Sequence, residues 1–262
     1  MIGFFFKKNF YDGWDNLVWI VVFNLIILAI SAAGLYLLQS VFTTITIIAV
    51  PIFILFVCLD FIMLFAVSEG CANLVDYKSS PYRETFSYIK DVWKIATLFG
   101  LLISIVIILV ALGIPFYLSY GNFVGLSLAF FIFWAALVIV LALQWFLPLY
   151  SQLHGGFLKT LKKSFILLFD NTGFSLLLFF YSIFMMIFSV ILIFVVPGTV
   201  GICMAQNNAL KLRMKKYDWL EAHPEIIPST VRKQIPWEEI LDEDKEIVGN
   251  RTLKNLIFPW KD

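Results

Sequence analysis

The chain has 262 residues, of which 61% are apolar and only 14% are charged, and its formal net charge is +1. A soluble globular domain is roughly 45–50% apolar and about 25% charged, so the composition excludes an ordinary soluble domain, and the small net charge gives no attraction to nucleic acid. The mean hydropathy of +0.91 and long apolar runs predict an all-α, polytopic transmembrane helical bundle, because backbone polar groups in lipid must be satisfied within helices.

The apolar runs divide the chain into spans. Five of them are long enough to cross a bilayer, at about 17–38, 45–67, 95–118, 123–149 and 172–196. Residues 1–16 lack the small-residue cleavage site of a signal peptide, so we interpret them as an interfacial segment with Phe10 and Trp14 at headgroup depth. Two charged segments, within 83–100 and 159–176, each lead into a new span. We expect both to form cytoplasmic elbow helices.

Lysine and arginine residues predict the orientation of the spans. They precede the first span and occupy both charged loops, whereas the other two links carry none. The positive-inside rule therefore places the N-terminus and both loops in the cytoplasm of a bacterial cytoplasmic membrane. Four further basic residues follow the fifth span closely, at Lys211, Arg213, Lys215 and Lys216. A short sixth span over 198–212, after the helix-breaking Pro197-Gly198, would keep these charges inside as well.

The number of spans stays open between six and five. Twelve residues from Thr199 to Leu210 cover only about 18 Å as a helix, whereas the hydrocarbon core is roughly 30 Å thick. The helix can extend to Leu212 if nearby basic side chains snorkel to the interface. We favour six spans with both termini in the cytoplasm, and five spans with an external tail is the alternative.

An acidic, tryptophan-containing tail at 217–262 follows the 1–216 transmembrane domain, and we expect it to be soluble and cytoplasmic. Its prolines at 224, 228, 236 and 259 exclude one long helix, but Pro236 suits a helix start and Gly249 a helix end, which predicts a short helix over 237–248. Three tryptophans are candidate partner-docking residues, because tryptophan often dominates protein interfaces: Trp219, Trp237 and Trp260. The alternative is that the tail packs onto the chain's own loops.

One ionisable residue, Asp60, lies deep inside a predicted span. An acid at this depth is expensive and marks a functional site by default, here a proton or cation site. The alternative, which we favour, is a protonated acid that hydrogen-bonds to a neighbouring helix, because no basic partner lies within a span. Asn24, Ser31 and Gln144 are the candidate partners, and the first two share one helix face.

Two amides, Asn207 and Asn208, lie in the short last segment. They either line a polar cavity or, as we favour, face headgroups or water because this segment barely enters the membrane. No cofactor and no metal site are expected, because the two histidines are isolated and the three cysteines form no CxxC pair. The sequence contains no nucleophile, base or nucleotide-binding motif, so we do not expect an enzyme.

Several stretches resemble the YesL-like family of bacterial integral membrane proteins. They are Lys7–Leu28, Tyr82–Leu101, Phe146–Leu149 with the lysine-rich segment after it, and Val196–Gly198 with the later Asn207–Leu210. Together they touch most of residues 1–216, whereas the tail beyond Tyr217 is longer than in a typical member. The molecular function of that family is unknown, and its members tend to be encoded beside carbohydrate ABC importers, so the resemblance implies an association and transfers no catalytic residue.

Two functional hypotheses follow from these observations. The first is an accessory or regulatory membrane subunit of a carbohydrate ABC importer, which docks on permease or ATPase subunits through its charged elbows and its tail. The second is a self-contained small-solute permease or channel with Asp60 in the path. A broken last helix is compatible with this hypothesis.

Overall fold

The long apolar runs are helical in the computed structural model, which describes residues 1–42, 46–223 and 235–249. Within these residues every regular element is a helix, which confirms the all-α class. Five stretches are long and apolar enough to cross a membrane: α2 (Leu17–Phe42), α3 (Thr46–Val75), α5 (Ile89–Leu118), α6 (Phe123–Leu143) continued by α7 (Phe146–Leu153), and α9 (Thr172–Ile191). These correspond to the five full-length spans that the sequence predicts.

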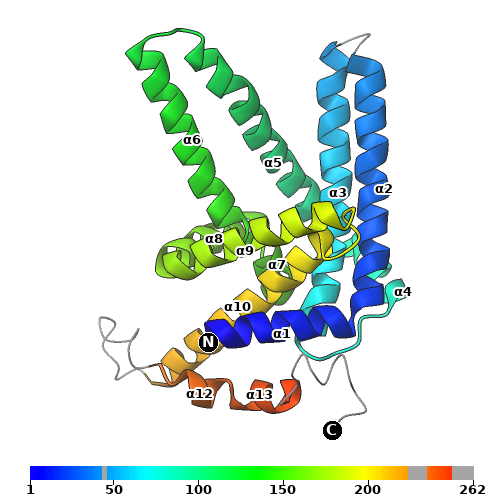
Figure 1. The fold of residues 1–262 in the computed structure, drawn as a ribbon, viewed down its shortest axis with the longest axis vertical. Coiled ribbons are helices and arrows are strands. Elements are labelled where there is room, and N and C mark those ends of the chain that lie inside the picture. Colours follow the sequence, from blue (N-terminus) through cyan, green and yellow to red (C-terminus); the bar gives the residue numbers. More distant parts are fainter. Residues whose placement is uncertain (43–45, 224–234, 250–262) are drawn as a thin grey trace.

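Four of these helices form two hairpins that diverge from each other. Figure 1 shows α2 beside α3 and α5 beside α6, with α3 and α5 meeting near their lower ends. The fifth helix, α9, runs crosswise to them in this view, below the opening between the hairpins. The hairpins therefore share one packed end and leave much of the surface of α6 exposed.

The remaining helices gather at the packed end. They are α1 (Ile2–Asp15), α4 (Tyr82–Ser87), α8 (Phe157–Asp170), α10 (Gly198–Ala222), α12 (Trp237–Ile240) and α13 (Asp242–Val248). Among them, α10 is central, because it packs against α1, α2, α3, α7, α9 and α12. Its buried residues continue from Gly198 to Lys216, so one helix joins the α2–α3 hairpin, α7 and α9 to the N-terminal helix and to the tail.

Aromatic side chains form most of the junction between the hairpins. Phe65 of α3, Phe99 of α5 and Phe146 of α7 are buried, and their ring centroids lie 4.6–6.0 Å apart. Such tilted ring pairs stabilise a core beyond the area that they bury. A Cβ at Gly100 would lie 2.9 Å from the Cα of Cys58, so this glycine permits the close approach of α3 and α5.

Several predicted boundaries differ from the observed ones. The second span was expected to end at residue 67, but α3 continues to Val75, and Ser68 in this extension bonds to Ser151 of α7 and Asn207 of α10. The run over 123–149 is interrupted between α6 and α7. The predicted domain boundary after residue 216 falls inside α10, and the predicted helix over 237–248 is divided at Leu241 into α12 and α13.

The predicted sixth span over 198–212 forms the first part of α10. This helix is not among the five that are apolar enough to cross a membrane, so the short sixth span stays a prediction. The segments expected to be elbow helices contain α4 and α8, each followed directly by a longer apolar helix.

Candidate functional site

Asp60 contacts the neighbouring helix through one of its two carboxyl oxygens. Ser31 Oγ on α2 donates to Asp60 Oδ2 on α3 at 2.8 Å. The other oxygen, Oδ1, is buried and has no hydrogen-bond partner among the described residues. The structure thus places Ser31, one of the three expected partners, beside Asp60, and it places Asn24 and Gln144 elsewhere.

Asn24 on α2 binds the turn between α9 and α10. Its Nδ2 donates to the carbonyl oxygens of Val195 at 3.0 Å and Pro197 at 2.8 Å, and its Oδ1 accepts from the backbone N–H of Val200 at 3.0 Å. The first N–H groups of a helix lack internal partners, so Asn24 caps α10 from another helix. Gly198, whose φ is +60°, lies so close that a Cβ there would overlap the Asn24 amide.

Gln144 and its neighbour Trp145 connect the break between α6 and α7 to α9. Gln144 Nε2 donates to the carbonyl oxygens of Leu141 at 2.9 Å and Ser175 at 3.0 Å. Trp145 Nε1 donates to Ser175 Oγ at 2.9 Å. These bonds satisfy polar groups where the helix is interrupted, which gives Gln144 a structural role.

Asn207 and Asn208 are both fully buried, so the expectation that their amides face headgroups or water is wrong. Asn207 Nδ2 donates to Ser68 Oγ at 3.2 Å, and Asn207 Oδ1 accepts from Gln152 Nε2 at 3.2 Å. Asn208 Nδ2 donates to Asp12 Oδ2 at 3.0 Å. The polar side chains that give this segment its low hydropathy bond to α1, α3 and α7 and are buried among those helices.

A buried ionic group on α1 is the partner of Asn208 and was missed by the sequence reasoning. Lys8 Nζ and Asp12 Oδ2 lie 2.8 Å apart, one turn apart on α1, and only 2% of Lys8 is exposed. Burial lowers the pKa of Lys8 and raises the pKa of Asp12, and the charge of each partner opposes the shift of the other. The i, i+4 spacing of Lys8 and Asp12 was the only sequence signal for this pair.

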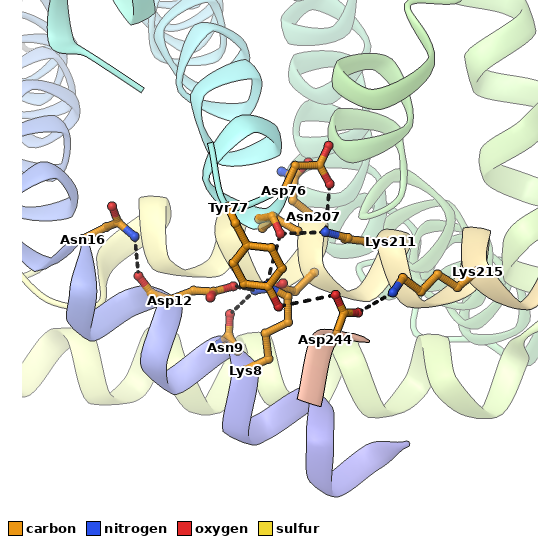
Figure 2. Close-up of polar contacts among 12 residues, drawn as sticks. Lys8, Asn9, Asp12, Asn16, Asp76, Tyr77, Asn207, Lys211, Lys215 and Asp244 are labelled. Atoms are coloured by element: carbon orange, nitrogen blue, oxygen red, sulfur yellow. Dashed lines mark hydrogen bonds and ion pairs between the residues drawn. The ribbon is translucent and has the colours of Figure 1, made fainter. Parts of the chain in front are cut away.

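The end of α3 lies between two lysines. Lys8 Nζ donates to the carbonyl oxygen of Val75 at 3.1 Å, and Lys211 Nζ of α10 donates to the same oxygen at 2.9 Å. The ring of Tyr77 lies between them, with its centroid 4.0 Å from Lys8 Nζ and 4.9 Å from Lys211 Nζ. Cations are favourable at the negative end of a helix, and here they join α1, α3 and α10 (Figure 2).

The tail packs onto this group through α13. Asp244 is buried, and its Oδ2 lies 2.7 Å from Lys215 Nζ. Tyr77 OH donates to Asp244 Oδ1 at 3.5 Å, and Leu241 is buried beside α10. Figure 2 shows Asp244 pointing toward Tyr77 and Lys215. For residues 235–249, the tail therefore packs onto the chain's own body.

The structure describes two of the three candidate docking tryptophans, and their surroundings differ. Trp237 is partly buried and its ring faces Arg213, with 5.7 Å between the ring centroid and Cζ. Trp219 is partly buried near the end of α10 and stacks on His223 at 4.4 Å between centroids. Trp260 lies outside the described residues. The side chain of Trp237 is thus engaged within the chain.

The polar side chains of the site form hydrogen bonds and ion pairs that connect one helix of the chain to another. No group of three or more metal-ligating side chains occurs within residues 1–42, 46–223 and 235–249, and the cysteines there are free and buried. No family model, curated protein or solved structure matches the chain. The resemblance to the YesL-like family therefore stays a prediction.

Proposed function

We propose that the chain is a non-catalytic accessory or regulatory membrane subunit that acts by docking on partner proteins. The observation that carries the proposal is the use of the buried amides. Asn24, Gln144, Asn207 and Asn208 each bond to another helix of the chain, and they do not converge on one path. Polar groups that are used in bonds between helices suit a scaffold better than a transport pathway.

The outer face of the docked tail supplies a docking surface. It is strongly acidic, with exposed Glu238, Glu239, Asp242, Glu243 and Glu246. Leu241, Asp244 and Val248 are buried on the opposite face, so the acidic side chains are carried by a segment already held in place. A preordered surface loses less conformational entropy on binding than a loose chain does. This arrangement favours a partner with a basic surface.

The same-side contacts support a cytoplasmic position for both ends of the chain. Lys8 of α1 and Lys211 of α10 meet at the end of α3, and Lys216 of α10 lies 3.0 Å from Asp170, the last residue of α8, which is followed closely by α9. α9 therefore leaves from the side to which α10 returns, as six spans or a short hairpin require. The positive-inside rule assigns this lysine-rich side to the cytoplasm, and we place the protein in a bacterial cytoplasmic membrane.

We take the partner to be a carbohydrate ABC importer, because the stretches that resemble the YesL-like family imply that association. This identification rests on the resemblance, whereas the docking role rests on the tail. The test is co-purification from native membranes in mild detergent, with mass spectrometry of the proteins that accompany the chain. Importer permease or ATPase subunits in stoichiometric amounts are the expected result.

A matched pair of variants tests the docking surface itself. Asp242→Lys with Glu243→Lys reverses two exposed charges on the tail and should remove most of the co-purified partner. Asp218→Lys with Glu221→Lys reverses two exposed acids on α10 and should leave the partner in place. Wild-type protein that purifies alone, under conditions that preserve other membrane complexes, would remove the docking proposal. Deleting 217–262 is a poorer test, because that cut passes through α10.

A second candidate function is a small-solute permease with Asp60 in its path. The unpartnered Oδ1 of Asp60 is the observation that favours it. Asp60→Asn should then change solute flux in liposomes, whereas Ser31→Ala, which removes only the hydrogen bond to Oδ2, should change it less. Unchanged flux in the Asp60→Asn protein removes Asp60 from any path.

A further inference from the structure

A cavity of about 450 Å³ lies where the start of α9 meets α10 and the tail. Asn171, Thr172, Gly173 and Phe174 form one side of it, and Arg213 and Lys216 of α10 form another. Trp237 of the tail and Ile2 of α1 complete the wall. The cavity thus combines two cations with aromatic and aliphatic side chains, at the end of a helix apolar enough to cross a membrane.

The guanidinium of Arg213 is buried in this wall without a carboxylate partner. Only 6% of the residue is exposed, and among the described residues no acidic oxygen lies within ion-pair distance of it. Its Nη1 donates to Asn171 Oδ1 at 3.3 Å, its Nη2 lies 3.1 Å from the weak acceptor Sδ of Met1, and its Nε has no partner. A guanidinium has five N–H donors, so most of its donor capacity is unused.

Two aromatic rings lie near this guanidinium, and no carboxylate of the described residues forms an ion pair with it. Its Cζ lies 3.9 Å from the ring centroid of Phe174 and 5.7 Å from that of Trp237. Burial lowers the pKa of Arg213 to about 10, which still leaves it protonated at neutral pH. The Phe174 ring packs against the cation, and a planar guanidinium is suited to recognition of an oxyanion.

The nearby charges leave a net positive cavity. Asp170 is the only acid among the described residues that line the cavity, and it is engaged by Lys216 Nζ at 3.0 Å and by the hydroxyl of Tyr217. Arg213 is then the remaining charge. The first N–H groups of α9, at Thr172, Gly173 and Phe174, lie at the positive end of the helix dipole, on the same side as the cavity.

We propose that this cavity binds a phosphate group through Arg213, Lys216 and the first turn of α9. Arginine forks match the geometry of phosphate oxygens, and helix N-termini favour anions. Ile2 is 45% exposed beside the cavity, and Leu177 lines it, so an acyl chain can continue from a bound phosphate along apolar surface. The phosphate belongs either to an anionic phospholipid or to a free phosphate compound, and the chemistry of the site is the same for both.

The two sources are separated with the full-length protein. Purified protein is placed in nanodiscs of phosphatidylcholine alone or with added phosphatidylglycerol, and separately in detergent with inorganic phosphate. Retained lipid is counted by native mass spectrometry, and the thermal unfolding midpoint is recorded. Retention of phosphatidylglycerol over phosphatidylcholine assigns a lipid headgroup, and a rise in the midpoint with inorganic phosphate alone assigns a free phosphate. Neither effect in either setting overturns the proposal.

Variants at Gly173 provide a test that does not depend on a buried residue. A Cβ at Gly173 meets open space, and an acidic residue in the first turn of a helix is itself favourable. Gly173→Asp therefore keeps the fold and places a competing carboxylate in the cavity, and it should weaken phosphate binding roughly tenfold or more. Gly173→Ala adds the same Cβ without charge and keeps the backbone N–H, so it should bind phosphate clearly better than Gly173→Asp does.

Arg213→Gln completes the set. It removes the charge but keeps much of the side-chain length, and it should weaken binding at least as much as Gly173→Asp. Should Arg213→Gln fail to fold, the Gly173 pair still decides the matter. Equal binding by Gly173→Asp and Gly173→Ala would show that the cavity does not hold an anion.

Discussion

Helices α6 and α10 show the reverse of the pattern in a soluble protein, where apolar helices are buried and polar helices are exposed. α6 is almost entirely apolar and yet largely exposed, with Phe123, Phe131 and Trp134 all at least 48% exposed. α10 carries Asn207, Asn208, Arg213 and Lys216, all of which are buried. In lipid, apolar surface gains little by leaving its solvent, so packing and interhelical hydrogen bonds hold helices together. The comparison teaches that low hydropathy does not exclude a helix from the packed interior of this chain, because interhelical hydrogen bonds can hold its polar side chains there.

The largest loss of stability is expected at the ionic pair that supports α10. Asp12→Ala leaves the buried ammonium of Lys8 without its carboxylate, 2.8 Å away in the wild type, and should lower the free energy of unfolding by about 3–5 kcal/mol. Chemical denaturation in detergent measures this value. The double variant Lys8→Met with Asp12→Leu should be clearly less destabilised than Asp12→Ala, because it removes both charges. Equal losses would mean that the charges are not buried as a pair.

A smaller loss is expected at the cap of α10. Asn24→Ala removes bonds to Val195, Pro197 and Val200, and buried groups left unpaired cost about 1–3 kcal/mol. We therefore expect a loss of about 2–3 kcal/mol, with weakened hydrogen-exchange protection at the start of α10. Leu25→Ala, at an exposed position on the same helix, is the control and should have little effect. A wild-type exchange pattern in Asn24→Ala would contradict the capping role.

These contacts also show what the sequence could predict. The spans were found because hydropathy reports the solvent of a helix, and the partner of Asp60 was within reach because Ser31 lies on the adjacent span. The burial of Asn207 and Asn208 could not be predicted, because the same low hydropathy is found in a helix at the interface and in a helix buried among polar partners. The bond from Asn24 to Val200 joins residues 176 positions apart, and no local pattern encodes such a distance.

A weaker effect, dependent on pH, is expected where α10 meets α8. Burial favours a higher pKa for Asp170, but hydrogen bonds from Tyr217 and Lys216 outweigh it and hold the pKa below the ordinary 3.8. A carboxylate of this kind contributes stability above its ordinary pKa and loses it as the pH falls through the folded-state value. Exchange protection around Tyr217 should therefore fall below about pH 4 in the wild type. Asp170→Asn should lower that protection at neutral pH and remove its acid dependence.

The smallest effect is expected on the exposed face of α6. Phe131 is 70% exposed, and Phe131→Ala should change the free energy of unfolding by no more than about 0.5 kcal/mol. The measurement is the same denaturation in detergent. A loss as large as that of Asn24→Ala would show that this face packs against another protein chain, and the contrast between α6 and α10 would then apply only to the isolated subunit.

Buried polar groups on α10 hold the fold together, and the interaction between Asp12 and Asn208 offers the most direct test of this role. Asn208 Nδ2 donates to Asp12 Oδ2 at 3.0 Å across two helices. A double-mutant cycle of Asp12→Ala and Asn208→Ala, measured by denaturation, isolates this contact. We predict a coupling of about 1–2 kcal/mol. Additive losses, with no coupling, would contradict this contact between α1 and α10.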